Sequence, residues 1–309
     1  MRIVHTRMLH ISEKGHGLRF LAVLAAGLVI GLLSGCGTGA NYDDMAANDA
    51  PVPPPLETEV PRSGFDPAGP VFLEELTWPE VRDALAAGWT TILIPTGGVE
   101  QGGPHLALGK HNAILRVTAE RIARRLGDAL VAPVIAYVPE GEINPPTGHM
   151  RYPGTITLPD ETFRKLLEST ARSFRTEGFK DIVLLGDSGG NQEGMRQVAE
   201  LLNNEWAGSG VHVYFIDDYY SGNGFHDWLL SQGETEDAIG THAGIEDTSQ
   251  LMAAAPEMVR TDRLDQAALE GSGVTGDPTR ASAEYGQRGL DMKVDAAVAQ
   301  IEKLRGAAR

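Results

Sequence analysis

Apolar positions along this chain form two patterns, short continuous runs and longer segments with helical spacing. The short runs, several of them rich in β-branched residues, predict buried strands. They span residues 91–95, 131–138, 155–158, 181–185 and 211–216. In the longer segments apolar residues recur every three or four positions and charged residues fill the opposite face, which predicts amphipathic helices. These segments span residues 77–87, 112–126, 159–177, 192–206, 247–255 and 291–304.

Several helix boundaries are marked by residues that favour caps. Thr77 and Glu80, three positions apart, have the spacing of a capping box, and Pro79 suits the first turn of a helix. Gly127 and Gly178 follow helical segments and predict where these end. Strands that alternate with helices predict an α/β fold with a largely parallel central sheet flanked by helices on both faces.

The first 36 residues have the composition of a targeting segment. Residues 1–19 carry four basic side chains and one acid, and residues 20–33 are uncharged and almost wholly apolar. A basic region followed by a short apolar core and small residues predicts a secretory signal, and the core is too short to span a membrane comfortably. The ending Leu-Ser-Gly-Cys resembles the lipobox of bacterial lipoproteins, which implies lipidation of Cys36, the single cysteine. The alternative is an ordinary signal peptide with an incidental cysteine.

Residues 37–70 are predicted to form a tether. They contain seven prolines among Asn, Asp, Ala and Gly, and too few apolar residues to fold. We expect the tether to hold the globular part, residues 71–309, away from a membrane. That part is compatible with a single large α/β domain. Lipidated Cys36 would be its only membrane attachment and would place the protein in the bacterial cell envelope, on the periplasmic or outer-membrane face.

The charge of the chain excludes one class of partner. The chain has 26 Lys and Arg against 42 Asp and Glu, and removal of residues 1–36 leaves 22 against 41, a formal charge of −19. Such a surface repels polyanions. We therefore expect no nucleic-acid partner.

Side chains capable of chemistry gather in Gly-rich loops after the predicted strands. They are Glu100, His105, His111, His149, Asp187, Ser188, Asn191, His242 and Asp247. Four of the six histidines beyond residue 36 belong to this set. Ligands of open α/β sheets bind beyond the carboxyl ends of the strands, so we expect these loops to converge there. The alternative is that these loops lie on the surface and carry ordinary histidines.

Four stretches of the chain resemble the creatininase (creatinine amidohydrolase) family. They are Glu100-Gln101-x-Gly103-Pro104-His105-Leu106-x-Leu108-Gly109, His149-Met150-x-Tyr152-Pro153-Gly154-Thr155, Gly189-Gly190-Asn191, and His242-Ala243-Gly244 ahead of Thr248-Ser249. The resemblance implies a creatininase-like α/β sandwich, often hexameric, that hydrolyses cyclic or linear amides at a two-metal site holding zinc or manganese. On this ground we expect a homo-oligomer, as large as a hexamer, and a small-molecule amide substrate.

The metal ligands of the resembled family are only partly present. The family's Glu after the first strand falls on Glu100, whereas its metal-binding His falls on Gly102 and its bridging Asp on His111. Its His before Gly-Gly-Asn falls on Ser188, and the Glu that often precedes Thr-Ser falls on Asp247. Glycine offers no side-chain ligand, and a neutral serine is a poor ligand for zinc.

The chain could still bind a metal ion with a different set of ligands. Zinc takes about three protein ligands plus water. We expect one or two zinc or manganese ions, held by Glu100, His111 and Asp187, with His105 or Asp247 as substitutes for the third ligand. Such an ion lowers the pKa of bound water and polarises an amide carbonyl.

Catalysis and substrate binding are assigned to the remaining loop residues. The expected catalytic residues are Glu193, His242 and Asp247, and the expected substrate-binding residues are His105, His149, Ser188 and Asn191. Glu193 or Asp247 would pass a proton to the leaving nitrogen, and His242 would hold the substrate. The predicted function is a metal-dependent amidohydrolase acting on a small amide.

Two other functions stay open. Residues 186–190, Gly-Asp-Ser-Gly-Gly, fit the G-x-S-x-G nucleophile elbow between a strand and a helix. Ser188 with Asp217 or Asp218 and His242 would make a serine hydrolase, which an organophosphate inactivates and a chelator does not. Alternatively, the replaced ligands indicate a catalytically inactive, creatininase-like lipoprotein that binds a ligand and contains no stoichiometric metal.

Overall fold

The computed structural model describes residues 60–62 and 64–308. The predicted signal peptide and lipobox, including Cys36, lie outside the described residues, as does most of the predicted tether. Within the described part of the tether, the Phe65 ring packs edge to face on Trp89, with centroids 4.6 Å apart. The chain thus contacts the domain before residue 70, and the expected domain limits stay predictions.

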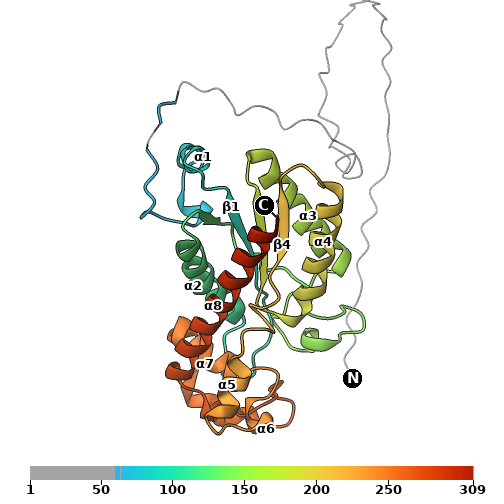
Figure 1. The fold of residues 1–309 in the computed structure, drawn as a ribbon. Coiled ribbons are helices and arrows are strands. Elements are labelled where there is room, and N and C mark those ends of the chain that lie inside the picture. Colours follow the sequence, from blue (N-terminus) through green and yellow to red (C-terminus); the bar gives the residue numbers. More distant parts are fainter. Residues whose placement is uncertain (1–59, 63, 309) are drawn as a thin grey trace, which may run out of the picture. The chain divides into compact units, whose positions relative to one another are not determined.

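Four parallel strands form the central sheet in the order β2–β1–β3–β4 (Figure 1). The strands are β1 Thr91–Thr96, β2 Ala129–Val131, β3 Asp181–Gly186 and β4 His212–Phe215. Every residue of β1 and β3 is buried, as is typical of central strands covered on both faces. The predicted largely parallel sheet is confirmed.

The register of the sheet brings two loops together. Thr96 at the end of β1 pairs with Gly186 at the end of β3. Because the strands are parallel, the loops that follow them leave the same edge of the sheet. The side-chain amide of Asn191 ties these loops by donating to the carbonyls of Thr96, at 3.0 Å, and Gly97, at 2.8 Å.

Helices cover both faces of the sheet (Figure 1). The contacts place α3 (Asp160–Glu177) and α4 (Gln192–Glu205) together on one face, and α2 (Lys110–Leu126) and α8 (Ala283–Ala308) together on the other. Gly127 and Gly178 adopt left-handed backbone with φ of 75° and 108° and end α2 and α3 as predicted.

The remaining helices flank this core. The first helix, α1 (Trp78–Ala86), begins with the predicted capping box of Thr77 and Glu80. Three helices lie beyond the carboxyl ends of the strands, in the lower part of Figure 1: α5 (Phe225–Ser231), α6 (Glu236–Ile239) and α7 (Ile245–Ala254). No helix among the described residues is both long enough and apolar enough to cross a membrane.

One predicted strand is shorter than expected, and another is not a strand in the structure. The run 131–138 contributes only its first residue to β2, and Pro133, which lacks a backbone donor, follows directly. Residues 155–158 form no strand, only an isolated bridge between Ile156 and Val99. Both segments are instead parts of the loops that reach the cavity described below.

The last helix, α8, begins eight residues before its predicted start, and two glycines in its first part pack closely against other elements. A Cβ at Gly286 would lie 1.7 Å from the Ser249 carbonyl oxygen, and one at Gly289 would lie 2.7 Å from the Phe225 ring. Glycine lowers helix propensity, so the sequence pattern places the start too late. In the structure the two glycines allow α8 to approach α7 and α5.

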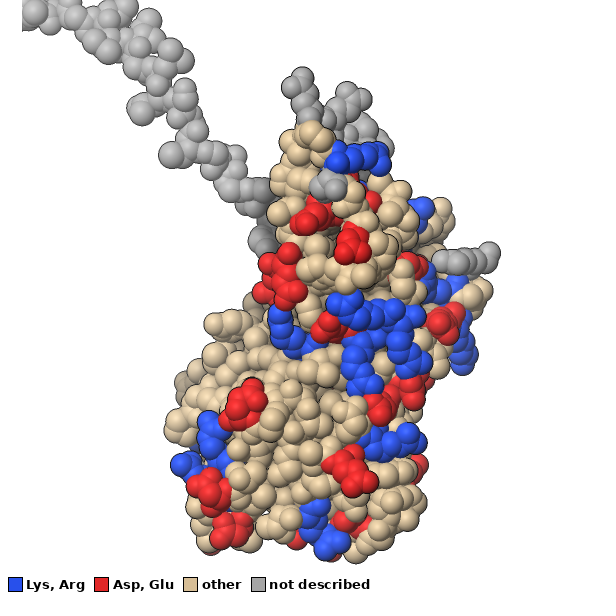
Figure 2. Space-filling view, turned by 90° about the vertical axis from the view of Figure 1, so that its left-hand side faces the viewer, with Lys and Arg blue, Asp and Glu red and all other residues tan. Residues whose placement is uncertain are grey.

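A band of basic side chains crosses the face formed by α2 (Figure 2). The arginines of α2 are paired with acids. The pairs are Arg116–Glu75, Arg121–Asp291, Arg124–Glu120 and Arg125–Asp295. Two of the acids belong to α8, so the pairs also link α2 to α8 at the surface.

Candidate active site

A cavity of about 950 Å³ lies at the carboxyl ends of the strands. Loops after β1 and β3 and the segments before α3 and α7 form its wall. Its polar lining includes Glu100, His111, Glu140, His149, Asp187, Ser188, Glu193, Tyr220, His242 and Asp247. Loops that are far apart in the sequence therefore converge at this edge of the sheet, as expected.

Glu100 lies buried at the centre of a group of charged side chains. Its Oε1 accepts hydrogen bonds from Lys110 Nζ and from His111 Nε2, the latter at 2.7 Å, and its Oε2 lies 3.3 Å from His149 Nε2. Burial alone would raise the pKa of Glu100, but the Lys110 charge and the His111 hydrogen bond hold that pKa well below its usual range. Glu100 is therefore ionised, and both of its oxygens have partners.

His111 bridges two acids. Its Nε2 donates to Glu100 and its Nδ1 donates to Asp187 Oδ2 at 2.8 Å, an arrangement that requires both nitrogens to be protonated. Burial and the Lys110 charge lower the pKa of His111, but the hydrogen bonds to Asp187 and Glu100 outweigh them and raise it. Lys293 donates to Asp187 Oδ1. Burial would raise the pKa of Asp187, but Lys293 and His111 lower it to about 2.

Lys110 is the first residue of α2 and is fully buried. Besides its contact with Glu100, its Nζ lies 3.8 Å from Asp247 Oδ2. Burial lowers the pKa of Lys110, but the charges of Asp247 and Glu100 outweigh burial and raise it. The ammonium is charged, although a cation in the first turn opposes the helix dipole. The two carboxylates compensate for that unfavourable position.

Glu140 differs from the other acids because it holds a proton. Burial, together with the hydrogen bond and charge of Glu100, raises the pKa of Glu140 to about 10. Ser188 Oγ lies 3.5 Å from Glu140 Oε1. Near neutral pH, Glu140 is thus a protonated carboxyl group in the wall of the cavity.

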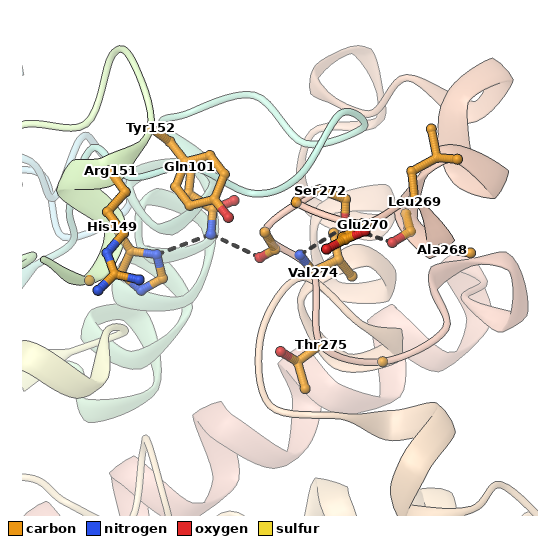
Figure 3. Close-up of a pocket in the computed structure, with 15 residues that line it drawn as sticks. Gln101, His149, Arg151, Tyr152, Ala268, Leu269, Glu270, Ser272, Val274 and Thr275 are labelled. Atoms are coloured by element: carbon orange, nitrogen blue, oxygen red, sulfur yellow. Dashed lines mark hydrogen bonds between the residues drawn. The ribbon is translucent and has the colours of Figure 1, made fainter.

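The side-chain amide of Gln101 fixes the proton of His149 (Figure 3). Gln101 Oε1 accepts from the backbone N–H of Gly103 at 2.9 Å, and Nε2 donates to the Gly273 carbonyl at 2.9 Å. The same Nε2 donates to His149 Nδ1 at 3.1 Å, so the neutral ring carries its proton on Nε2, the nitrogen that faces Glu100. Gln101 and His149 also line a neighbouring cavity of about 630 Å³.

His242 has the opposite proton arrangement. Its Nε2 donates to the Gln101 carbonyl at 2.9 Å, which leaves the lone pair on Nδ1, 3.8 Å from Glu100 Oε1. Burial and the Lys110 charge lower the pKa of His242 to about 4. His242 is therefore neutral at neutral pH and can accept a proton.

A strained residue positions His242. Ala243 has a left-handed backbone with φ of 53°, which costs on the order of 1–3 kcal/mol for a residue with a Cβ. Its N–H donates to Asp247 Oδ2 at 2.8 Å, and its carbonyl accepts from His105 Nε2 at 3.1 Å. His105 is buried and does not line the cavity. Its expected part in substrate binding stays a prediction that this placement does not favour.

Two further predicted site residues are engaged elsewhere. Asn191 is fully buried and its amide joins the loops after β1 and β3. Glu193 lies at the cavity wall, but its exposed carboxylate is held by Arg196 and Gln197. The structure therefore offers Glu140, not Glu193, as a buried proton donor, and the roles expected for Asn191 and Glu193 stay predictions.

Ser188 lacks the partners of a catalytic triad. In the described part of the chain its side chain has Glu140 as its hydrogen-bond partner, and no histidine is bonded to it. Asp217 accepts from Gln300, and His242 is bonded to the Gln101 carbonyl. The strand–turn–helix context of the predicted elbow is present, but the required hydrogen-bonded chain is not.

One group of side chains is spaced for a metal ion. Ligand atoms of Glu100, His149 and His242 lie within 4.8 Å of one another. Their spacing suits an ion, but their hydrogen bonds do not. Glu100 is already bonded to two cations, and His149 turns a protonated nitrogen towards Glu100. In the expected set of Glu100, His111 and Asp187, each imidazole nitrogen is bonded to a carboxylate. Of the atoms in these two sets, only His242 Nδ1 presents a free lone pair.

Three important residues were missed by sequence reasoning, namely Lys110, Glu140 and Lys293. Lys110 had a signal, since a lysine in the first turn of a helix is disfavoured. Lys293 also had one, because it interrupts the apolar face of the last helix between Leu290 and Val294. Glu140 lies in an irregular Gly- and Pro-rich loop, and nothing local indicates where its side chain points.

Comparison with known proteins gives a consistent result. A family model named Creatininase and described as creatinine amidohydrolase matches residues 74–301. The mycofactocin precursor peptide peptidase of Mycobacterium ulcerans (strain Agy99) is 31% identical over 245 residues, which cover 71% of this chain and 87% of that protein. The creatinine amidohydrolase of Pseudomonas putida is 26% identical over 198 residues, which cover 63% of this chain and 75% of that protein.

Solved structures agree with the sequence comparisons. The manganese form of creatininase superimposes with a TM-score of 0.63 at 25% identity, covering 76% of this chain and 98% of that chain. A mutant creatininase described as of the Zn-Zn type gives a TM-score of 0.62 with the same identity and coverage. The expected creatininase-like α/β fold is confirmed.

Proposed function

The chain belongs to the creatininase family, and we propose that it hydrolyses a C–N bond of a small cyclic or linear amide in the 950 Å³ cavity. The relatives named above are a peptidase and an amidohydrolase, both names for enzymes that hydrolyse C–N bonds. The cavity lies within the size range of small-molecule sites. The observation that carries the proposal is a proton donor, Glu140, and a proton acceptor, His242, in the wall of one cavity.

The two residues have complementary roles in the proposed reaction. His242 Nδ1 takes a proton from water as its oxygen bonds to the amide carbon, and the protonated Glu140 gives its proton to the nitrogen as the C–N bond breaks. The products are a carboxylic acid and an amine. Asp247, through the backbone N–H of Ala243, positions His242.

The expected zinc or manganese cofactor has mixed support. Structures of relatives are named for manganese and zinc, and Glu100, His149 and His242 are suitably spaced. The bonding of Glu100 and the proton of His149 do not fit such an ion, so the proposed reaction uses side chains alone.

The same bonding favours a second candidate function. Because no ligand atom of Glu100 is free, the cavity would also suit a protein that binds a polar amide and does not cleave it. A panel of small amides and short peptides, assayed for released amine with the wild type and with Glu140→Gln, separates the two. Release that the variant lacks supports the hydrolase, whereas ligand binding without release supports the binding protein.

Attachment, location and assembly are proposed from the sequence. Lipidation of Cys36 would anchor the protein in the bacterial cell envelope, on the periplasmic or outer-membrane face, as a homo-oligomer as large as the hexamer common in the family. Metabolic labelling with a fatty acid, lost in Cys36→Ser, tests the anchor. Light scattering of the purified chain tests the assembly.

A further inference from the structure

We infer that Lys110 and Lys293 are built-in counter-ions of the buried acids, and that the centre they form therefore takes no divalent metal ion. The inference concerns charge compensation and holds whether or not the cavity hydrolyses an amide. Three observations carry it, namely the contacts of the two ammonium groups, the bonding of the carboxylate oxygens, and the space beside Gly102.

The first ammonium group belongs to Lys110. Its side chain has no solvent exposure, its Nζ contacts Glu100, and it lies 3.8 Å from Asp247. A buried ammonium without carboxylate partners is strongly unfavourable. Lysine and acids therefore depend on one another, and the charge of Glu100 is already compensated within the protein.

The second ammonium group reaches the cluster from the opposite direction. Lys293 lies on the buried face of α8, between Leu290 and Val294. Its Nζ contacts Asp187 and lies 4.9 Å from the centroid of the Tyr219 ring, a cation–π contact. A lysine in an apolar helix face is exceptional, and here the ammonium group is paired with the buried carboxylate of Asp187.

Every oxygen of the two most buried acids already faces a proton donor of the protein. Glu100 Oε1 accepts from Lys110 and His111, and its Oε2 faces the protonated nitrogen of His149. Asp187 Oδ1 accepts from Lys293, and its Oδ2 accepts from His111. A divalent ion would have to displace a buried cation, or the protonated nitrogen of His149, to reach either carboxylate.

The space for an additional ligand is also filled. A Cβ at Gly102 would lie 2.8 Å from Leu106 Cβ and 3.5 Å from Lys110 Cδ. A side chain at this position would therefore clash with Leu106 and would lie in contact with the stem of Lys110. The missing side chain at Gly102 and the buried lysine are thus two parts of one arrangement.

The first experiment uses the full chain purified without chelator. Elemental analysis is expected to find no stoichiometric zinc or manganese, and excess zinc or manganese chloride is expected to leave the Tm unchanged, because an ion that binds only the native state raises its stability. Stoichiometric metal, or a Tm that rises with either ion, overturns the inference. Neither readout depends on catalysis, so the hydrolase proposal can fail separately.

The second experiment removes one counter-ion. Lys110→Met keeps the length of the side chain and leaves Glu100 without its ammonium, so the Tm is expected to fall by roughly 10 °C. Zinc or manganese is then expected to recover part of the loss, since Glu100 Oε1 has lost one of its two cationic partners. The matched control is Lys165→Met, which replaces an exposed lysine that lies 3.1 Å from Glu161. This variant is expected to change the Tm little, and added zinc or manganese is expected to leave its Tm unchanged.

A double variant separates the loss of charge pairing from a general disruption of the fold. Glu100→Gln/Lys110→Met removes both charges and is expected to be more stable than Lys110→Met alone, because the carboxylate in direct contact with Lys110 is then replaced by a neutral amide. A Lys110→Met protein as stable as the Lys165→Met control overturns the inference, as does a double variant less stable than the single one.

Discussion

The His111 imidazole donates to Glu100 Oε1 through Nε2 at 2.7 Å, so the two residues expected to share a metal ion instead bond to each other. Eleven residues separate them in the chain, and Glu100 lies on a loop whereas His111 lies in the first turn of α2. With Asp187 on the other imidazole nitrogen, the contact makes an ion-pair network where the sequence predicted a coordination sphere.

His242 should act as a base at unusually low pH. Its pKa of about 4 means that it stays neutral, and able to accept a proton, until the pH falls through that value. We expect kcat/KM of the wild type to persist to about pH 4 on its acid side. We also expect His242→Gln to lower it by about 10²–10⁴-fold at neutral pH. An acid limb with a midpoint near the ordinary histidine value would argue against this role.

Ser188 should be dispensable as a nucleophile. Its hydrogen-bond partner is Glu140 at 3.5 Å, and no described histidine can take its proton. Ser188→Ala is therefore expected to keep activity within a few-fold, and an organophosphate is expected to leave the wild type active. A loss of about 10³-fold in the variant, the scale expected when a triad member is removed, would restore the serine hydrolase hypothesis.

Asp187 should make the protein sensitive to acid. Its folded pKa of about 2 lies below the ordinary value of 3.8, so its contribution is present above 3.8 and is lost as the pH falls through about 2. The shift corresponds to about 2 kcal/mol of unfolding free energy.

Denaturant unfolding between pH 2 and 7 measures this contribution. The wild type should lose stability more steeply than Asp187→Asn in the acid window. At neutral pH the variant should be less stable by about 3–5 kcal/mol, since Lys293 then lacks its partner. Equal slopes for the two proteins in the acid window would show that Asp187 is not the titrating group.

The capping box of α1 offers a test far from the site. The Thr77 side chain accepts a hydrogen bond from the N3 backbone, and the Glu80 carboxylate accepts one from the Thr77 backbone N–H, so Thr77→Ala should cost about 1 kcal/mol. Thermal unfolding measures the loss, and activity should be unchanged because the helix does not contribute to the cavity. A larger loss would mean that Thr77 has a second role in the packing of the domain.

Local patterns in the sequence determined most of the fold. The apolar runs of β1 and β3, the helical spacing of α2, α3 and α4, and the glycines at 127 and 178 each depend on neighbours within a few residues. The same holds for the family resemblance, because its motifs are contiguous. These features were predictable because backbone preference and burial period are properties of short segments.

Only the tertiary structure decided how the charges are paired. Lys110 and Lys293 are far apart in sequence, yet both end on acids in the same cavity wall. Glu140 holds a proton because the fold buries it and places Glu100 beside it. Side-chain direction in irregular loops and the pKa of a buried group depend on neighbours that the fold brings together, which local patterns do not encode. The sequence by itself therefore determined the scaffold and most of the polar residues of the cavity, and the packed structure added Glu140 and decided that the buried acids are neutralised by the protein's own cations.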